Sequence, residues 1–409
     1  MDKSSATELA RAAGLNLWTF RGRTLLPVVQ GGMGVGISAG RLAGTVASFD
    51  AVGTISSVDL RRLHPDLMEA TSELSGPQAK AQIDAANKEA LHREIKRARE
   101  LARGRGLIAV NVMRALDQYE TYVRQALESG ADALVVGAGL PLDLPELARD
   151  FPKATLVPIL SDARGVQLLV RKWEKKGRLP DAIVIEHPRL AGGHLGAAKV
   201  ADLKDPRFEF DVVLPEVREF FVKSGFDKEI PLIAAGGVSS REDIKRLQGL
   251  GASAVQLGTA FAVTCESDAS LAFKEVLAGA KPEDLVEFTS VAGLPARAVR
   301  TPWLDKYLRL QERMQKSAHQ KPHCTMWFDC LTKCGLRDGH ADWGQFCIDK
   351  VLGYALAGDV RKGLFFRGAG RLPFGTQIRP VQDLLNWLVG NLVPPTIAVA
   401  LANAELQEA

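Results

Sequence analysis

The sequence has no long apolar run and almost no excess charge. None of its uninterrupted apolar segments approaches the ~20 residues that a membrane span requires, and the N-terminal segment MDKSSATELARAAG lacks the apolar core of a signal peptide. We therefore expect a cytoplasmic protein with no membrane partner. The 52 basic and 48 acidic residues give a formal net charge of +4 without a basic arm or stripe, which argues against nucleic acid as a partner. A small molecule is the partner that we expect, and the composition is compatible with a homo-oligomer.

Cysteine is also scarce, and its distribution is not that of a disulfide framework. Four of the five cysteines, Cys324, Cys330, Cys334 and Cys347, fall in one stretch with the spacing C-x5-C-x3-C-x12-C. This spacing contains no CxxC pair of the kind common in zinc and iron–sulfur sites, so we predict no metal site. The same four cysteines are the candidates if a metal is bound, and ordinary packing is the alternative.

What the sequence does have is a regular alternation of two kinds of segment. Eight short runs rich in Val, Ile, Leu and Ala lack the period-2 pattern of half-exposed strands, which predicts strands covered on both faces, as in a parallel sheet. They are residues 24–30, 51–56, 107–113, 133–139, 155–160, 182–187, 231–237 and 254–261. Segments with helical spacing lie between them, among them 117–130, 162–177, 240–251 and 267–279. Eight alternations over about 255 residues predict one (β/α)8 TIM barrel. A doubly wound open sheet is the competing fold, but it usually needs only about five or six strands.

Two regions depart from this repeat. Residues 60–106 form a long polar stretch after the second strand, which predicts a helical insertion that serves as a lid or an interface element. After residue 280 the pattern changes to the cysteine-bearing segment, a helix over 348–357, a hairpin in GLFFRGAGR and a final helix in VQDLLNWLVG. We therefore predict an α/β protein with a barrel over residues 1–280 and a mainly helical C-terminal subdomain over 281–409.

Glycines and small polar residues follow the apolar runs, and in a barrel these strand ends form the active face. Glycine lets a flat ligand or a phosphate approach the backbone and leaves amide N–H groups free to donate. The seventh and eighth runs end in AAGGVSS and QLGTAF, where barrel enzymes often bind a phosphate; the steric need of a tight turn is the alternative. The first motif, VVQGGMGVGIS, lacks the third glycine of GxGxxG and any GK[ST], so it fits a flavin barrel better than a dinucleotide fingerprint.

The stretch IEHPRLAGGHLG places a histidine in a glycine-rich turn after the sixth run. A lone histidine is often only a hydrogen-bonded structural residue. At the end of the sixth strand, however, the ring of His194 would point into the barrel mouth, opposite the phosphate loops. An imidazole with a pKa near neutrality can remove or donate a proton beside a reacting carbon. His194 is therefore the candidate catalytic residue.

The motifs QGGMGVGIS, AGGHLG, IPLIAAGGVSS and AVQLGTAF, in this order, resemble the nitronate monooxygenase family, formerly called 2-nitropropane dioxygenases. That family includes flavin-dependent NAD(P)H:quinone reductases and the flavin-type enoyl-ACP reductase, and its members are FMN-binding TIM barrels. The resemblance implies FMN as the cofactor and His194 as the catalytic acid or base. It places Gly32, Met33, Asn111 and Gly193 near the flavin ring, Gly236, Gly237, Gly258 and Thr259 at its phosphate with Gln256 close by, and Gly34, Asp162 and Ala235 in the same cofactor site.

The resemblance leaves the activity open. Familiar nitronate monooxygenases tend to have QAPM at the first strand and AGGHRG at the sixth, whereas this chain has QGGM, AGGHLG and a cysteine-bearing extension. The leading interpretation is the oxidation of alkyl nitronates with oxygen to a carbonyl compound and nitrite. The alternative on the same barrel is a reductase of quinones or enoyl thioesters that takes its electrons from NAD(P)H. A flavin-free barrel that isomerises or cleaves a phosphorylated metabolite is the third possibility.

Overall fold

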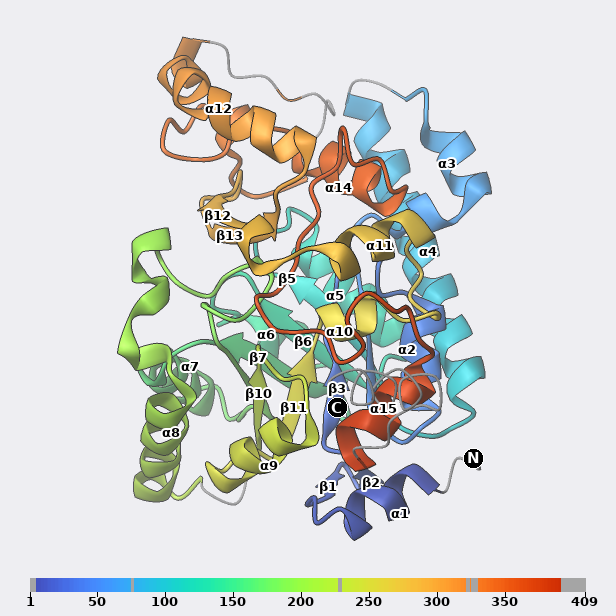
Figure 1. Cartoon of the computed structure of the whole chain (residues 1–409), viewed down its shortest axis with the longest axis vertical. Helices are drawn as coiled ribbons and strands as arrows, with labels where there is room; N and C mark the ends of the chain where they lie inside the picture. Colours follow the sequence, from blue (N-terminus) through green and yellow to red (C-terminus); the bar gives the residue numbers. More distant parts are fainter. Residues whose placement is uncertain (1–4, 75–76, 227–229, 321–323, 325–329, 391–409) are drawn as a thin grey trace, which may run out of the picture.

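Eight parallel strands close into a barrel at the centre of the molecule (Figure 1). The computed structural model describes residues 5–74, 77–226, 230–320, 324 and 330–390. Around the barrel the strand order is β10-β11-β3-β4-β5-β6-β7-β8, and each strand is parallel to both neighbours. The strands are β3 (Val28–Gln30), β4 (Val52–Ser56), β5 (Leu107–Met113), β6 (Ala133–Gly137), β7 (Thr155–Leu160), β8 (Ile183–Glu186), β10 (Leu232–Ala235) and β11 (Ala254–Leu257). Each predicted apolar run supplies one of them, so the predicted TIM barrel is confirmed.

The first apolar run is divided between two sheets. Its beginning forms β2 (Arg23–Leu25), which pairs antiparallel with β1 (Trp18–Phe20), and only its end joins the barrel. The rings of Trp18 and Phe20 are buried and pack in one hydrophobic cluster with barrel side chains such as Val135. In Figure 1 this hairpin lies at the lower end of the barrel. The hairpin therefore plugs the barrel at the end opposite to the strands' carboxyl ends.

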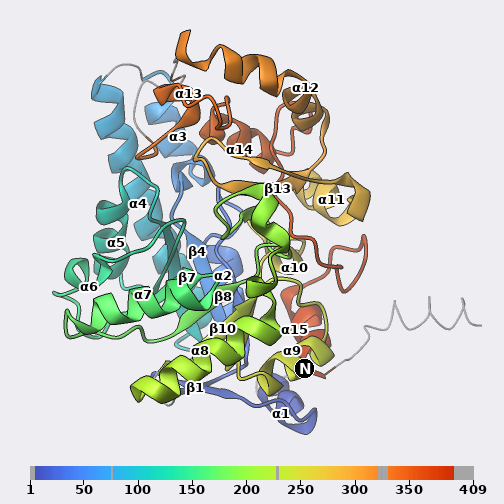
Figure 2. The same ribbon diagram turned by 90° about the vertical axis from the view of Figure 1, so that its left-hand side faces the viewer.

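Helices cover the outside of the barrel (Figure 2). In this part of the chain they are α1 (Ser5–Ala12), α2 (Gly40–Ala47), α3 (Pro65–Thr71), α4 (Pro77–Ala102), α5 (Tyr119–Glu128), α6 (Leu144–Leu147), α7 (Ala163–Glu174), α8 (Phe210–Ser224), α9 (Arg241–Gly249), α10 (Thr259–Ala262) and α11 (Leu271–Gly279), with 3-10 turns at Leu60–Leu63, Val200–Lys204 and Pro206–Phe208. The four helices that spacing predicted are α5, α7, α9 and α11. Among the described residues, no helix combines the length and the apolarity needed to cross a bilayer.

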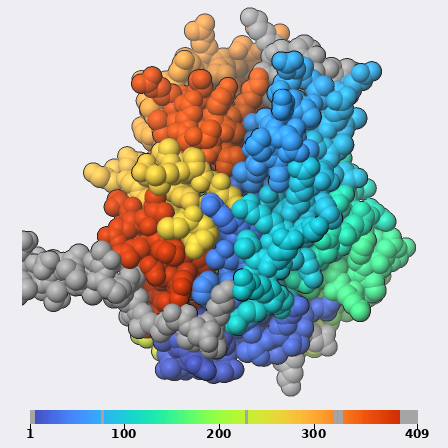
Figure 3. All heavy atoms as spheres, turned by 90° about the vertical axis from the view of Figure 1, so that its right-hand side faces the viewer, coloured from blue at the N-terminus to red at the C-terminus, as the bar shows by residue number. Residues whose placement is uncertain are grey.

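The segment predicted as an insertion contains the regular helix of the second β/α unit. The second half of α4 buries Leu91, Ile95 and Ala98. It packs closely on α2, as the short distance at Gly44 shows: a Cβ at this glycine would lie 2.6 Å from the carbonyl oxygen of Ala98. The added part is the 3-10 turn at Leu60–Leu63, α3 and the first half of α4. In Figure 3 these residues (blue) lie beside the orange and red surface of the C-terminal segment.

The chain beyond residue 280 mixes a small sheet with helices. Strands β12 (Leu285–Thr289) and β13 (Pro295–Val299) pair antiparallel, and β13 also pairs with β9 (Gly193–His194), which lies between β8 and β10 in the chain. The helices are α12 (Pro302–Lys316), α13 (Gly335–Asp338), α14 (Ile348–Leu356) and α15 (Val381–Gly390), with 3-10 turns at Pro282–Asp284 and Ala318–Gln320. Helix α15 contacts α1 and α9 of the barrel. The division of the chain at residue 280 stays a prediction.

The predicted hairpin in GLFFRGAGR is wrong. Phe366 instead forms an antiparallel bridge with Ala298 of β13, and the amide of Val299 donates to the carbonyl oxygen of Phe365 at 2.8 Å. The segment therefore continues the small sheet rather than folding back on itself. Its pairing partner lies far away in the sequence, so a local pattern could not show it.

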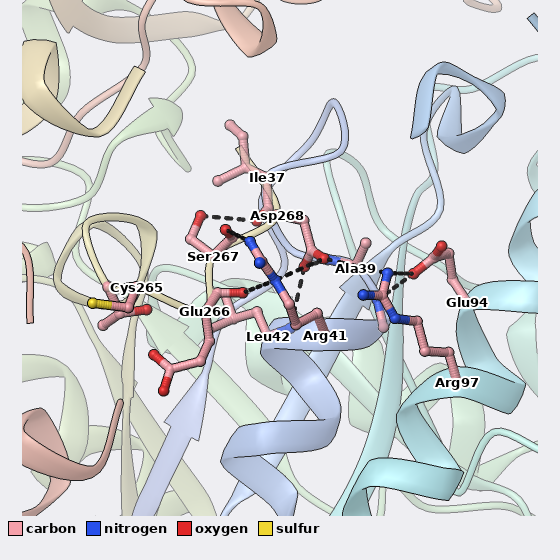
Figure 4. A network of polar contacts seen from close by, with 12 residues as sticks. Ile37, Ala39, Arg41, Leu42, Glu94, Arg97, Cys265, Glu266, Ser267 and Asp268 are labelled. Carbon is pink, nitrogen blue, oxygen red and sulfur yellow. Dashed lines mark hydrogen bonds and ion pairs between the residues drawn. The ribbon is translucent and has the colours of Figure 1, made fainter. Parts of the chain in front are cut away.

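A polar network ties the first barrel loop to the last (Figure 4). The Asp268 carboxylate accepts hydrogen bonds from the amides of Ala39 and Leu42 at 3.0 and 3.2 Å, at the start of α2. Glu94 of α4 accepts from the amide of the first residue of α2 at 2.6 Å. The guanidinium of Arg41 donates to the carbonyl oxygens of residues 266 and 267. The glycine-rich loop that precedes α2 is thereby held from two sides.

Candidate active site

A cavity of about 300 Å3 lies where the carboxyl ends of the barrel strands meet. This is the usual ligand position in barrel enzymes. Nearly all of the residues that the sequence predicted for cofactor binding or catalysis line this one cavity, although they come from loops far apart in the chain. They are Gly32, Met33, Gly34, Asn111, Gly193, His194, Ala235, Gly236, Gly237, Gln256, Gly258 and Thr259.

Asp162 is the exception. Its side chain accepts a hydrogen bond from the amide of Gly165 at 2.7 Å and caps the N-terminus of α7. The residue is absent from the described lining of the cavity. In the structure Asp162 thus acts as a helix cap, and it does not lie with the other predicted residues in the cavity lining. Residues 60–106, predicted as a lid or an interface element, also contribute no described residue to the lining.

Two glycines of the cavity lining, which we call the glycine floor, pack so closely against neighbouring side chains that a Cβ would not fit at either of them. A Cβ at Gly32 would lie 2.3 Å from the Cβ of Asn111, and a Cβ at Gly34 would lie 2.9 Å from the hydroxyl oxygen of Ser56. The Asn111 side chain is fixed by its amide nitrogen, which donates to the carbonyl oxygen of Val135 at 3.0 Å. This arrangement lets a flat ligand lie directly on the backbone.

The loops after β10 and β11 present unused hydrogen-bond donors. Gly236 and Gly237 have φ angles of +113° and +73°, a conformation that favours glycine. Within the described part of the chain, the amide N–H groups of Gly236, Gly237, Gly258 and Thr259 donate to no acceptor. The side-chain oxygen Oε1 of Gln256, next to them in the lining, is buried and likewise has no partner. Free amide donors gathered at two neighbouring strand ends suit an anion such as a phosphate.

His194 belongs to the short strand β9, which β13 holds in place by pairing Ala296 with His194. Its ring lies 5.6 Å from the ring of Phe366, measured between centroids. The Nε2 atom is buried without a hydrogen-bond partner among the described residues. Burial lowers the pKa of His194 to about 4, below the near-neutral value that the sequence analysis assumed, so the imidazole is uncharged at neutral pH.

Glu186 is a cavity residue that the sequence analysis missed. It is the last residue of β8, and its side chain is part of the cavity lining. Burial raises its pKa from 4.5 to about 7. The available signal was a carboxyl group at the end of the apolar run AIVIEH, shortly before the glycine-rich turn that contains His194.

The C-terminal segment supplies one wall of the cavity, which we call the upper wall. The sequence analysis did not predict this wall. An apolar part consists of Leu331, Ile348 and Leu352, together with Leu116 from the β5–α5 loop. A second part, residues 366–372, which we call the strap, contributes all its members except Ala369. The strap packs on the glycine-rich turn that precedes His194, since a Cβ at Gly192 would lie 2.4 Å from the amide nitrogen of Gly368.

A charged pair lies at the apolar end of the upper wall. Asp349 of α14 lines the cavity and receives a hydrogen bond from Arg62 at 2.6 Å. Burial and the neighbouring carboxylate of Asp59 raise the pKa of Asp349 to about 7. Cys330 also lines the cavity, and burial is the main reason why its thiol pKa lies well above the ordinary value.

The metal candidates stay untested. Among the described residues, no group of three or more His, Cys, Asp or Glu side chains could hold a metal ion. Residues 325–329, between Cys324 and Cys330, lie outside the described residues.

Comparison with known proteins agrees with the motifs. The family model described as nitronate monooxygenase matches residues 19–391. A probable nitronate monooxygenase of Staphylococcus saprophyticus is 25% identical over 227 residues, which are 55% of this chain and 59% of that protein. The match therefore spans less than two thirds of that relative. A probable nitronate monooxygenase of Bacillus subtilis is 24% identical over 286 residues, which are 68% of this chain and 78% of that protein.

Solved structures show the same fold. A nitroalkane oxidase of Streptomyces ansochromogenes has a TM-score of 0.59 at 20% identity, covering 97% of this chain and 100% of that one. FabK of Thermotoga maritima has a TM-score of 0.58 at 20% identity, covering 98% of both chains. Because the family model spans almost the whole sequence, from the first hairpin through α15, the chain belongs to the nitronate monooxygenase family.

Proposed function

We propose that this chain binds FMN and oxidises alkyl nitronates, with His194 as the residue that moves a proton. The observation that carries the proposal is the convergence, in one cavity, of the glycine floor, free amide donors and an imidazole nitrogen without a partner among the described residues. These features come from separate strand ends, and a barrel without a ligand has no need to align them. Family membership adds the nitronate chemistry.

The residues present fit FMN. A planar ring suits the floor at Gly32, where even a methyl group would collide with Asn111. The buried Gln256 Oε1 and His194 Nε2 are polar atoms that a ligand would satisfy, because buried polar groups in proteins are almost always hydrogen-bonded. The free amides of the loops after β10 and β11 suit a terminal phosphate, as in other phosphate-binding barrels.

Bound FMN would supply the electron-transfer chemistry that amino-acid side chains lack. The chain's own residues would orient the substrate and move its proton. His194 is uncharged at neutral pH, and a neutral imidazole always carries one acceptor nitrogen. It can therefore take the proton from the carbon that bears the nitro group of a neutral nitroalkane. A preformed nitronate has already lost this proton, so its turnover should depend less on His194.

The proposal is tested by nitrite release and oxygen uptake with the FMN-loaded protein. Ethyl nitronate and neutral nitroethane are compared in the unchanged protein and in His194→Asn. We expect nitrite from the nitronate in both proteins, and from nitroethane mainly in the unchanged one. If the FMN-loaded protein releases no nitrite from either substrate, the nitronate assignment is wrong.

A second candidate is an NAD(P)H-dependent reductase of quinones or enoyl thioesters. It is favoured by the apolar wall of Leu116, Leu331, Ile348 and Leu352, which suits a larger apolar substrate than a short nitronate. The same FMN-loaded protein would then oxidise NADPH or NADH when a quinone or a crotonyl thioester is added. Nicotinamide oxidation without nitrite release from nitronates would move the assignment to this activity.

A further inference from the structure

The strap lies directly on the loops that present the free amides. The amide of Gly368 donates to the hydroxyl oxygen of Thr259 at 3.0 Å, and a Cβ at Gly370 would lie 3.3 Å from the Cα of Gly237. Figures 1 and 2 show the loop before α15 passing beside α10, which begins at Thr259. A threonine hydroxyl that accepts one bond still has its proton to donate. The contact therefore fixes the hydroxyl group of Thr259 and leaves its proton free to donate to a ligand.

The strap adds donors of its own to this place. The amides of Gly370 and Arg371 donate to no acceptor within the described part of the chain, and both residues line the cavity. The strap is held in shape by Arg367, whose buried guanidinium donates to the carbonyl oxygens of Leu277 and Gly368 at 2.9 and 2.7 Å. Two of the three guanidinium nitrogens of Arg367, Nε and Nη1, thus serve the backbone.

Arg371 is one of the few charged residues in the described lining of the cavity. Among the described residues that line the cavity, the carboxyl groups are Glu186 and Asp349 and the guanidinium groups are Arg367 and Arg371. The side chain of Arg371 is exposed and makes no hydrogen bond or ion pair in the described part of the chain. It follows Gly370 by one peptide unit, about 3.8 Å between Cα atoms, so its side chain begins close to the loop at Gly237. A phosphate monoester carries about −1.5 to −2 charges at neutral pH, so a cation beside the amide donors would strengthen its binding.

We propose that Arg371 is the cation that binds the phosphate monoester of the ligand held by the loops at Gly237 and Thr259. This inference rests on the proposed FMN site and names the residue that makes the site prefer a phosphorylated flavin over riboflavin. An arginine is suited to the task, because its planar guanidinium can donate two parallel hydrogen bonds to one phosphate. The strap would thus complete, from the far end of the chain, a site whose other half lies on the barrel.

The test compares FMN with riboflavin, which has the same ring and no phosphate. Flavin-free protein is titrated with each flavin by fluorescence quenching, in the unchanged chain and in three variants. Arg371→Ala removes the cation, Arg371→Lys keeps a charge without the planar fork, and Arg361→Ala is the matched control, an exposed arginine ten residues earlier that does not line the cavity. Riboflavin binding also reports whether each variant still forms the ring site.

We expect Arg371→Ala to weaken FMN binding by about tenfold or more, the loss typical of a hydrogen bond to a charged group, and to leave riboflavin binding unchanged. Arg371→Lys should fall between, and Arg361→Ala should match the unchanged chain. An equal loss for both flavins, or no loss for either, overturns the inference while leaving the FMN site in place. If the unchanged chain binds neither flavin, the proposed function itself fails.

Discussion

Replacing Glu186 with glutamine changes how the stability of the flavin-free protein depends on pH. Burial raises the pKa of Glu186 from 4.5 to about 7, so the folded protein holds this proton more tightly than the unfolded chain. Its contribution to stability is complete below pH 4.5, falls as the pH rises to about 7 and is constant above that. At about 1.4 kcal/mol per pKa unit, ionising the buried carboxyl costs the folded protein up to about 3 kcal/mol. Glutamine does not ionise and escapes this cost.

The free energy of unfolding of both proteins is measured by urea titration at several values between about pH 5 and pH 8. The stability of Glu186→Gln relative to the unchanged protein should increase with pH up to about 7 and then level off. The exposed Glu275 of α11, which does not line the cavity, provides the matched control variant Glu275→Gln. Parallel stability curves for Glu186→Gln and the unchanged protein would refute the reasoning, since they would mean that the carboxyl ionises as easily in the fold as outside it.

Three further changes test the site and its support. His194→Asn should retain bound FMN and lose about 100-fold in turnover of neutral nitroethane, the effect expected when a general base is removed; unchanged turnover would return His194 to a structural part. Gly32→Ala should lower both the melting temperature and FMN retention, because its Cβ would lie 2.3 Å from the Cβ of Asn111. Gly249→Ala is the control, since a Cβ there meets open space, and it should lower neither property. Equal effects of the two variants would contradict the close packing at Gly32. Asp268→Ala should lower the free energy of unfolding, measured in urea, by about 1 to 2 kcal/mol, because it removes the carboxylate that accepts hydrogen bonds at the start of α2. An unchanged free energy of unfolding would contradict this stabilising role.

The strand ends could be predicted because parallel barrels leave a local signal. Apolar runs covered on both faces read as continuous stretches of Val, Ile, Leu and Ala, and the residues after them must meet on one face. Gly32 and Asn111 could therefore be assigned to one site, although 79 positions separate them in the sequence. The structure adds the reason for the glycine, which is the contact with the Asn111 side chain.

The upper half of the site left no such signal. The strap and β9 form their contacts with β13 across about 70 to 100 positions of the chain, and no repeat pattern links segments of this kind. GLFFRGAGR therefore looked like a hairpin on its own. Asp162 shows the opposite case, because its place at a strand end suggested a ligand contact, and in the structure its carboxylate caps the helix that follows. Local position does not distinguish these two uses.

The measurement that bears most directly on the proposed FMN chemistry is an anaerobic absorbance spectrum of the purified protein. It is recorded with FMN added and unbound flavin removed, and again after propionate 3-nitronate is added without any nicotinamide. We predict the absorption bands of a bound flavin, and bleaching of those bands by the nitronate alone. A protein that shows no flavin bands after incubation with FMN would contradict the proposed function, whatever its fold.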